Sequence, residues 1–289
     1  MQTPEPVRRT SEIEDPTNLY VIHAMANRLT PLLARLHIRP NTVSVAGMLF
    51  GILAGFAYFR YHNPLFALAG FILMIAWHVM DGVDGQLARL THTQSESGKV
   101  LDGVCDYVTF IAVYTGLALN LSCQHGSWVW GLVIAAGACH AVQAAAYEVQ
   151  RQQYEFWGWD RKSKEITAAK AAAASKVFGA YRLYTRVQVL AVGFSADFQQ
   201  RLTAIFSRRP EHVAAIRLSY RETFAQPVRR WSILSANSRT IGIFICALLQ
   251  VPLCYFIFEV AGFSLVLAVL SWQQKRRHGR FLASLDELE

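Results

Sequence analysis

Apolar residues along this chain gather in six long runs that polar breaks separate. Each run approaches the length that a helix needs to cross a membrane, once its flanking residues are counted. The runs cover residues 43–59, 65–87, 100–121, 128–149, 241–255 and 256–272, and the last two divide near Pro252. This pattern predicts an all-α, polytopic membrane protein with six transmembrane helices.

A different apolar pattern precedes these runs, between residues 16 and 38. Its apolar residues recur every three or four positions, while Arg28 and Arg35 take other faces. They are Leu19, Ile22, Met25, Ala26, Leu29, Leu32, Leu33 and Leu36. This spacing predicts an amphipathic helix that lies on the membrane surface. Packing on a soluble core is the alternative, and the neighbouring spans count against it.

The segment between the fourth and fifth runs, residues 151–230, is long and basic. It contains an Ala-rich stretch, 166–175, with strong helix propensity. We expect cytoplasmic helices that lie against the membrane, with a solvated basic linker as the alternative. The predicted divisions are 1–40 (arm and surface helix), 41–150 (spans one to four), 151–230, 231–273 (spans five and six) and 274–289 (tail).

The distribution of charge predicts the orientation of the spans. The net charge is +8, and Arg and Lys concentrate in the N-terminal arm, in 151–230 and in the tail, whereas loops 61–64 and 122–127 hold none. Because basic loops stay in the cytoplasm, we expect both termini and the 81–106 region on the cytoplasmic side of a bacterial inner membrane. Basic charge beside apolar spans favours anionic lipids and a diphosphate substrate over nucleic acid as partners. The five cysteines form no C-x-x-C pair, so neither a disulfide framework nor a zinc site is indicated.

Four aspartates interrupt the apolar pattern between the second and third runs. Asp81 and Asp84 are three residues apart, and Asp102 and Asp106 are four apart, so on helices each pair shares one face. Residues 94–98 look like a short turn, and antiparallel helices joined by it would bring the two acidic faces together. Four crowded carboxylates at a membrane edge are costly to desolvate. Divalent cations relieve that cost, and all-carboxylate sites suit Mg²⁺ or Mn²⁺.

These aspartates are part of a longer motif, D-x2-D-G-x2-A-R-x8-G-x3-D-x3-D. Eight residues fill it without a gap: Asp81, Asp84, Gly85, Ala88, Arg89, Gly98, Asp102 and Asp106. The motif resembles the signature of the CDP-alcohol phosphotransferase family. The resemblance covers the motif and its flanking helices, about the first half of the chain.

The resemblance implies a two-metal site for Mg²⁺ or Mn²⁺. Asp81, Asp84 and Asp102 would be metal ligands. Asp106 would be the base that takes the proton of the acceptor hydroxyl, and a share in binding the second ion is a further role for it.

The resemblance also implies a CDP site beside the metal ions. Small residues there let a nucleotide approach the backbone, and an arginine offers a planar fork for phosphate oxygens. The corresponding residues are Gly85, Ala88, Gly98 and Arg89. Asn41 falls where the family often has an Asn near the nucleotide.

Further polar residues lie on the fourth and fifth runs. The fourth run carries one polar stripe, and such stripes in membrane helices usually face a cavity. Its members are His140, Gln143, Tyr147 and Arg151. Asn237 and Arg239 open the fifth run, within reach of an acidic headgroup. We expect these six residues in an acceptor pocket, with polar contacts between helices as the alternative.

With the resemblance, the pattern predicts a metal-dependent membrane enzyme of phospholipid synthesis. It would transfer a substituted phosphate group from a CDP-linked donor, with CDP-diacylglycerol favoured, to the hydroxyl of a small polar alcohol and release CMP. Glycerol phosphate, inositol, inositol phosphate, serine, choline and ethanolamine all stay open as acceptors. A homodimer is common in the family by resemblance.

Three alternatives remain at this point. A CDP-alcohol donor with a lipid acceptor uses the same motif. Intramembrane prenyltransferases also use Asp pairs and Mg²⁺, but their two clusters lie far apart in sequence, whereas here both fall within 26 residues. A cation transporter with buried acids would not need Gly85, Ala88 and Arg89 at these offsets.

Overall fold

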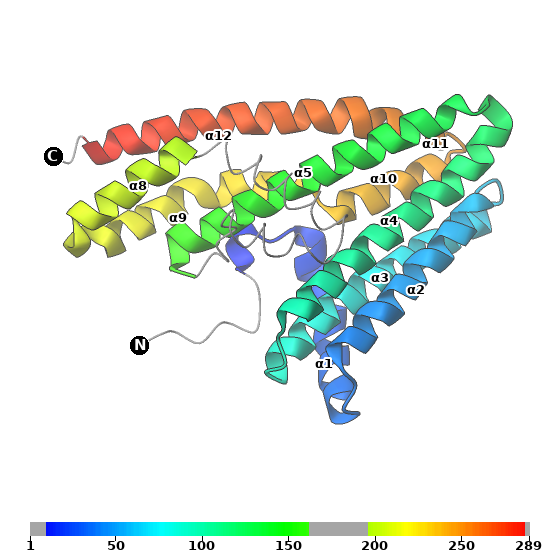
Figure 1. The fold of residues 1–289 in the computed structure, drawn as a ribbon, viewed down its shortest axis with the longest axis horizontal. Helices are drawn as coiled ribbons and strands as arrows, with labels where there is room; N and C mark the ends of the chain where they lie inside the picture. The colour runs from blue at the N-terminus through cyan, green and yellow to red at the C-terminus, as the bar shows by residue number, and fades with distance from the viewer. Residues whose placement is uncertain (1–9, 162–195, 287–289) are drawn as a thin grey trace. The chain divides into compact units, whose positions relative to one another are not determined.

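The computed structural model describes residues 10–161 and 196–286, and nearly all of them lie in helices (Figure 1). The α-helices are α1 (His23–Arg35), α2 (Pro40–Phe59), α3 (Pro64–Leu90), α4 (Glu96–His125), α5 (Trp128–Trp159), α8 (Ala196–Arg208), α9 (Val213–Arg230), α10 (Ala236–Leu248), α11 (Pro252–Ile257) and α12 (Phe263–Asp286). Single turns of 3-10 helix lie at Ser11–Ile13, Pro210–His212 and Trp231–Leu234, and π-helical turns at Asn18–Ile22 and Phe258–Gly262. The Ala-rich stretch 166–175 lies outside the described residues.

Six helical stretches of the described chain are long and apolar enough to cross a membrane. They are Pro40–Phe59, Pro64–Leu90, Ser97–His125, Trp128–Trp159, Pro210–Leu248 and Pro252–Leu285. The predicted fold class, all-α with six spans, is therefore confirmed. α5 and α12 continue past the predicted ends at 149 and 272, because a helix can extend into water beyond the apolar run that a membrane requires.

The boundary between the fifth and sixth spans lies earlier than the sequence predicted. α10 ends at Leu248, Gln250 takes a left-handed conformation with φ 63°, and Pro252 occupies the first turn of α11. Proline fits the first turn of a helix because its missing N–H has no partner to lose there. The predicted fifth span through residue 255 was therefore too long, although the division near Pro252 was correct.

The chain divides into two compact units. Unit 1 comprises Met1–Ala138 with Ala236–Val260, and unit 2 comprises Cys139–Ser235 with Ala261–Glu289. The whole carboxylate motif, from Asp81 to Asp106, belongs to unit 1.

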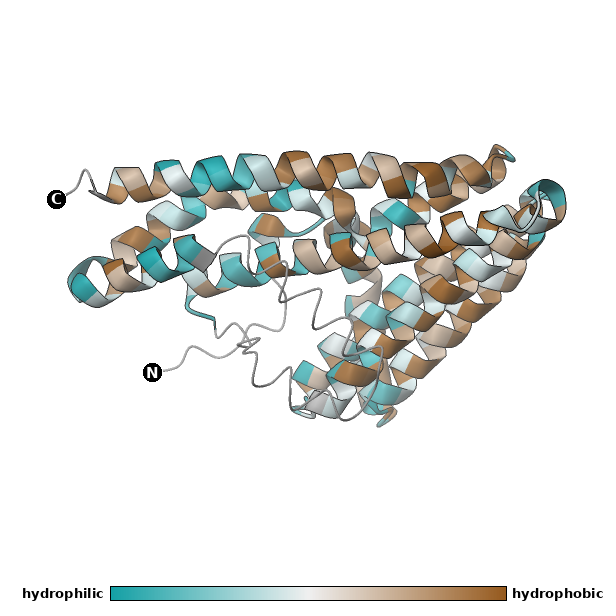
Figure 2. Cartoon of the chain, turned by 45° about the horizontal axis from the view of Figure 1, so that its top comes forward, coloured by the Kyte–Doolittle hydropathy of each residue, from teal (hydrophilic) through white to brown (hydrophobic). Residues whose placement is uncertain are grey.

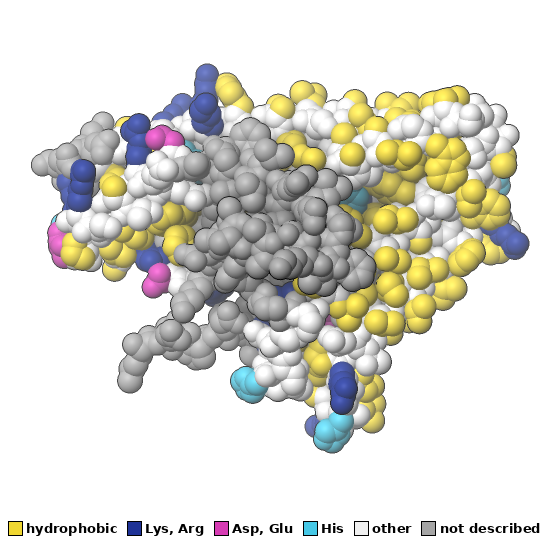
Figure 3. Space-filling view, viewed as in Figure 1, with side chains coloured by type: hydrophobic (Ala, Val, Ile, Leu, Met, Phe, Trp, Pro, Cys, Tyr) yellow, Lys and Arg dark blue, Asp and Glu magenta, His cyan; other side chains and the backbone are white. Residues whose placement is uncertain are grey.

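In unit 1, α2 packs against both α3 and α4. Glycines make this approach close: a Cβ at Gly51 would clash with the side chain of Thr109, and one at Gly55 would lie 2.5 Å from the carbonyl oxygen of Ala112. The hydrophobic effect does not drive helices together inside a membrane, and small residues there allow the close contacts that hold helices together. Large apolar side chains cover the outer surface of these helices (Figure 3), as a lipid-facing surface requires.

The N-terminal helix α1 also belongs to unit 1, and it packs against α3. Ile22 and Ala26 are buried against Val83 and Leu87. Other apolar side chains of this segment are exposed, namely Tyr20, Met25, Leu32 and Leu36. The predicted helix is present, and its apolar side chains extend beyond the face that packs against α3. Its place on the membrane surface stays a prediction.

In unit 2, α8, α9 and α12 share an aromatic core. The rings of Phe198 and His278 stack at 3.9 Å, and Tyr220, Phe224 and Phe281 surround them. Helices thus occur within the basic 151–230 segment, as the sequence predicted. α12 is apolar in its first part and hydrophilic over residues 273–280, before a last apolar stretch at its C-terminal end (Figure 2). This pattern agrees with a helix that begins in a membrane and leaves it.

Candidate functional site

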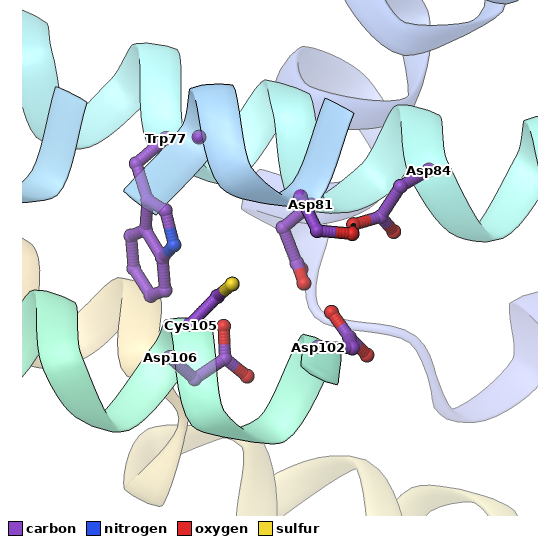
Figure 4. Close-up of a pocket in the computed structure, with 8 residues that line it drawn as sticks. Trp77, Asp81, Asp84, Asp102, Cys105 and Asp106 are labelled. Carbon is purple, nitrogen blue, oxygen red and sulfur yellow. Dashed lines mark hydrogen bonds between the residues drawn. The ribbon is translucent and has the colours of Figure 1, made fainter. Parts of the chain in front are cut away.

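Three of the four aspartates converge from two helices. One carboxylate oxygen from each of Asp81, Asp102 and Asp106 can be chosen so that all three lie within 4.8 Å of one another, and all three side chains are half-buried. Figure 4 shows Asp81 on α3 directed toward Asp102 and Asp106 on α4. The spacing of the motif therefore brings carboxylates of both pairs to one place.

The connection between α3 and α4 lies earlier in the chain than predicted. α3 ends at Leu90, His92 takes φ 55°, and Ser95 caps α4 by accepting a hydrogen bond from the backbone N–H of Gly98 at 3.0 Å. Serine at this position satisfies a donor that the first helical turn would otherwise leave without a partner. The predicted turn at 94–98 is therefore wrong in part, because 96–98 form the first turn of α4.

The fourth aspartate, Asp84, is buried and held by α2. The hydroxyl of Ser44 donates a hydrogen bond of 2.5 Å to Asp84 Oδ2, and both residues line the pocket that the carboxylates share. Gly47, Trp77 and Cys105 complete the lining. The sequence motif does not include any residue of α2. The small residues at 44, 47, 51 and 55 were the available signal that this face of α2 approaches other helices.

The residues expected at the nucleotide lie in two places around the carboxylates. The Arg89 guanidinium lies over Gly85, since a Cβ added there would be 3.4 Å from Arg89 Nη1. A Cβ added at Gly98 would be 3.3 Å from Asn41 Oδ1. Ala88 and Arg89 are half-buried. The structure thus brings Asn41 close to Gly98 of the motif. The role of these five residues in binding CDP stays a prediction.

The site fits a hard divalent cation. The three converging ligands are carboxylates from separate turns, and carboxylate oxygens are what Mg²⁺ and Mn²⁺ prefer. Anions this close repel one another unless a cation or proton intervenes. The described residues can therefore hold a metal ion at Asp81, Asp102 and Asp106, and Asp84 lines the same pocket.

The six residues expected in the acceptor pocket divide between the two units. His140, Gln143, Tyr147 and Arg151 belong to unit 2, and Asn237 and Arg239 belong to unit 1. The structure gives most of them protein partners of their own, so the acceptor pocket stays a prediction.

Their contacts differ in kind between the two units. In unit 2, Gln143 donates to Ser264 Oγ at 3.2 Å, and Arg151 forms a bidentate pair with Glu148, while His140 and Tyr147 are half-buried. In unit 1 the contacts join α10 to its neighbours: the side chain of Asn237 donates to Asn18, and Arg239 pairs with Glu259.

One further contact in unit 1 lies close to the motif. Nε2 of His78, one turn before Asp81, is 2.9 Å from the hydroxyl oxygen of Thr240 on α10. The ring of His78 also packs against Trp77, which lines the pocket. This buried contact fixes α10 beside the part of α3 that carries the carboxylates.

The part of the chain that contains the motif matches a known protein family. A family model described as CDP-alcohol phosphatidyltransferase matches residues 37–206, which is more than half of the chain and includes the four aspartates.

Several characterised proteins resemble parts of the chain. An archaetidylinositol phosphate synthase of Pyrococcus horikoshii is 34% identical over 93 residues, which are 32% of this chain and 47% of the relative. A CDP-diacylglycerol–serine O-phosphatidyltransferase of Mycobacterium tuberculosis is 31% identical over 114 residues, 39% of this chain and 38% of the relative. A phosphatidylinositol phosphate synthase of Mycobacteroides abscessus is 28% identical over 188 residues, 63% of this chain and 83% of the relative. The chain thus spans less than half the length of the first two relatives and most of the third.

Proposed function

This chain belongs to the CDP-alcohol phosphatidyltransferase family, and we propose that it transfers the phosphatidyl group of CDP-diacylglycerol to the hydroxyl of a small polar alcohol. The observation that carries the proposal is the convergence of Asp81, Asp102 and Asp106 within 4.8 Å on helices α3 and α4. This convergence supports the proposal, because a chance match to a family signature would not be expected to bring distant carboxylates together in the fold.

The reaction exchanges one phosphorus–oxygen bond for another. The acceptor oxygen forms a bond to the phosphorus that carries the diacylglycerol, and the bond from that phosphorus to the bridging oxygen of CMP breaks, so that CMP leaves. Two divalent ions, Mg²⁺ or Mn²⁺, would neutralise the diphosphate and the attacking oxygen when bound at Asp81, Asp84, Asp102 and Asp106.

The hydroxyl proton of the acceptor needs a base, and we assign that role to Asp106. Asp106 is the furthest of the four carboxylates along the motif, two helical turns beyond Gly98, or about 12 Å at 1.5 Å per residue. Its oxygen still lies within 4.8 Å of those of Asp81 and Asp102. A hydroxyl that enters at this edge can give its proton to Asp106 as the new bond forms.

The nucleotide would lie along Gly85, Ala88, Arg89 and Gly98, with Asn41 beside them. Support comes from the position of the Arg89 guanidinium over Gly85 and of Asn41 Oδ1 near Gly98. A guanidinium can donate two parallel hydrogen bonds to phosphate oxygens. Because cytidine nucleotides are cytoplasmic, this site and both termini would face the cytoplasm.

The choice of donor is supported by the name of the Mycobacterium tuberculosis relative, which specifies CDP-diacylglycerol. The names of the relatives differ in the acceptor, serine in one case and inositol phosphate compounds in others. The acceptor of this protein is therefore a question for experiment.

The test is an incubation of the purified protein with CDP-diacylglycerol, Mn²⁺ and a panel of alcohols and alcohol phosphates, with lipid products identified by mass. We expect one new phospholipid and an equal amount of CMP, both lost in excess EDTA. A product formed only from a CDP-alcohol and diacylglycerol would reverse the donor and acceptor. Absence of any cytidine-dependent lipid product from all combinations would contradict the proposal.

A further inference from the structure

Ser44 on α2 makes a direct contact with a carboxylate of the motif on α3, forty residues away. Its hydroxyl donates to Asp84 Oδ2 at 2.5 Å, and the exposed fractions of Ser44 and Asp84 are 7% and 6%. A distance of 2.5–2.7 Å is typical of an O–H donor bound to an ionised carboxylate. The contact joins a buried hydroxyl on α2 to a buried carboxylate on α3.

We propose that Ser44 is a positioning residue for the carboxylate site, acting through Asp84. This inference rests on the proposed function, because it concerns how the site binds its metal ions. A carboxylate is planar, so a hydrogen bond that fixes Oδ2 also fixes the direction of Oδ1. Ser44 thereby decides which way Asp84 presents its other oxygen to the pocket.

The serine has a choice of acceptors, and the distances show which one it uses. Ser44 Oγ lies 3.3 Å from the carbonyl oxygen of Pro40, one turn back in α2, and 2.5 Å from Asp84. A hydroxyl has one hydrogen to donate, and the charged acceptor at the shorter distance takes it. The bond within the helix, which serines commonly make, is the weaker of the two.

The shape of α2 explains why a serine can reach Asp84. Gly47, one turn further along, lines the same pocket, and a Cβ added there would be 3.1 Å from Cβ of Met80 on α3. This close approach lets the short side chain of Ser44 span the space between the helices. The first two turns of α2 thus contact both halves of the motif, with Asn41 near Gly98 and Ser44 on Asp84.

The test compares Mn²⁺ binding by the purified wild-type protein with that of S44A and S44T, measured from the electron paramagnetic resonance of free Mn²⁺. S122A is the matched control, because the hydroxyl of Ser122 donates to the carbonyl of Leu119 in the same unit at 3.0 Å. Loss of an outer partner of a metal ligand typically weakens metal binding about 10–100-fold. We expect that loss in S44A, near-normal affinity in S44T, which keeps the hydroxyl, and no change in S122A.

Two further readouts separate positioning from folding. The unfolding temperature without metal should change little in S44A, and turnover should recover as Mn²⁺ is raised, so that the apparent KM for metal changes more than kcat. Unchanged Mn²⁺ affinity in S44A, or an equal loss in S44T, would overturn the role of the hydroxyl.

Asp81→Asn belongs in the same titration, because it tests the metal site itself. If Asp81→Asn weakens Mn²⁺ binding but S44A binds Mn²⁺ as the wild type does, the Ser44 inference alone is overturned. No binding by the wild type would overturn both proposals.

Discussion

Arg239 and Glu259 form an ion pair in unit 1 with neither side chain exposed. Nε and Nη2 of Arg239 both donate to Glu259 Oε1, at 3.1 and 3.0 Å. The hydroxyl of Tyr255 donates to the other oxygen at 2.9 Å, and the hydroxyls of Tyr255 and Tyr114 lie 2.9 Å apart. The pair therefore joins α10 to the π-helical turn Phe258–Gly262, and its tyrosine contacts extend to α4.

Arg239→Ala should lower the unfolding temperature of the purified protein sharply. Removing one member of a buried ion pair leaves the other charge without compensation, at a cost of about 3–5 kcal/mol. Arg201→Ala is the control, because Arg201 pairs with Asp197 at 3.3 Å on an exposed surface, where such pairs contribute little. A thermal unfolding series in one detergent compares them. If Arg239→Ala stays as stable as Arg201→Ala but loses affinity for the acceptor, Arg239 belongs to the acceptor pocket instead.

Arg89→Lys should weaken CDP binding while leaving the fold intact. A lysine keeps the charge but loses the planar fork that bonds two phosphate oxygens at once. Arg60→Lys is a suitable control, because Arg60 lies over the ring of Phe66 at the other end of α3. Calorimetric titration with CDP measures both variants. Equal affinities in Arg89→Lys and wild type would show that Arg89 has a structural role.

Gly98→Ala should impair CDP binding through its neighbours. The added Cβ would lie 3.0 Å from Ser95 Oγ and 3.3 Å from Asn41 Oδ1, so the cap of α4 or Asn41 must move. Gly131→Ala provides the control, since nothing lies within 4 Å of its added Cβ. Normal CDP binding by Gly98→Ala would place the nucleotide elsewhere.

The orientation of the spans can be tested with cysteine labelling. The predicted loop 122–127 is shorter in the structure, because α4 continues to His125, and Cys123 lies exposed in the last turns of that helix. A Ser163→Cys variant places a second thiol in the basic 151–230 segment. With the other cysteines replaced, Cys123 should react with an impermeant maleimide in intact cells. Ser163→Cys should react only after permeabilisation, because basic segments stay in the cytoplasm. The reverse pattern would place the carboxylate site on the wrong side for a cytoplasmic nucleotide.

The sequence predicted those parts of the molecule that depend on local pattern. Continuous apolar runs located the six spans, and the i, i+3 and i, i+4 spacing located the carboxylates that meet between α3 and α4. The ends of α5 and α12 were missed because hydropathy records where apolar character stops rather than where a helix stops. The left-handed residue Gln250, which ends the fifth helical stretch, has no signal in hydropathy either.

Contacts between distant segments could not be predicted in the same way. The bond from Ser44 to Asp84 depends on how closely α2 packs against α3, and the partner of Arg239 depends on the packing of α10 near Phe258–Gly262. A serine in an apolar helix and an arginine at the start of one are each compatible with several environments. Only the packed structure determines which partner each side chain meets.

The most direct test of the account is a paired measurement on Asp106→Asn and Asp81→Asn in one detergent preparation. CDP binding is titrated and phosphatidyl transfer is measured for both variants. We expect Asp106→Asn to keep CDP binding and to lose about 10²–10⁴-fold in turnover, the usual effect of removing a positioned base. Asp81→Asn should instead weaken metal and CDP binding together. Near-normal turnover in Asp106→Asn, or a loss of CDP binding as complete as that in Asp81→Asn, would contradict the assignment of Asp106 as the base.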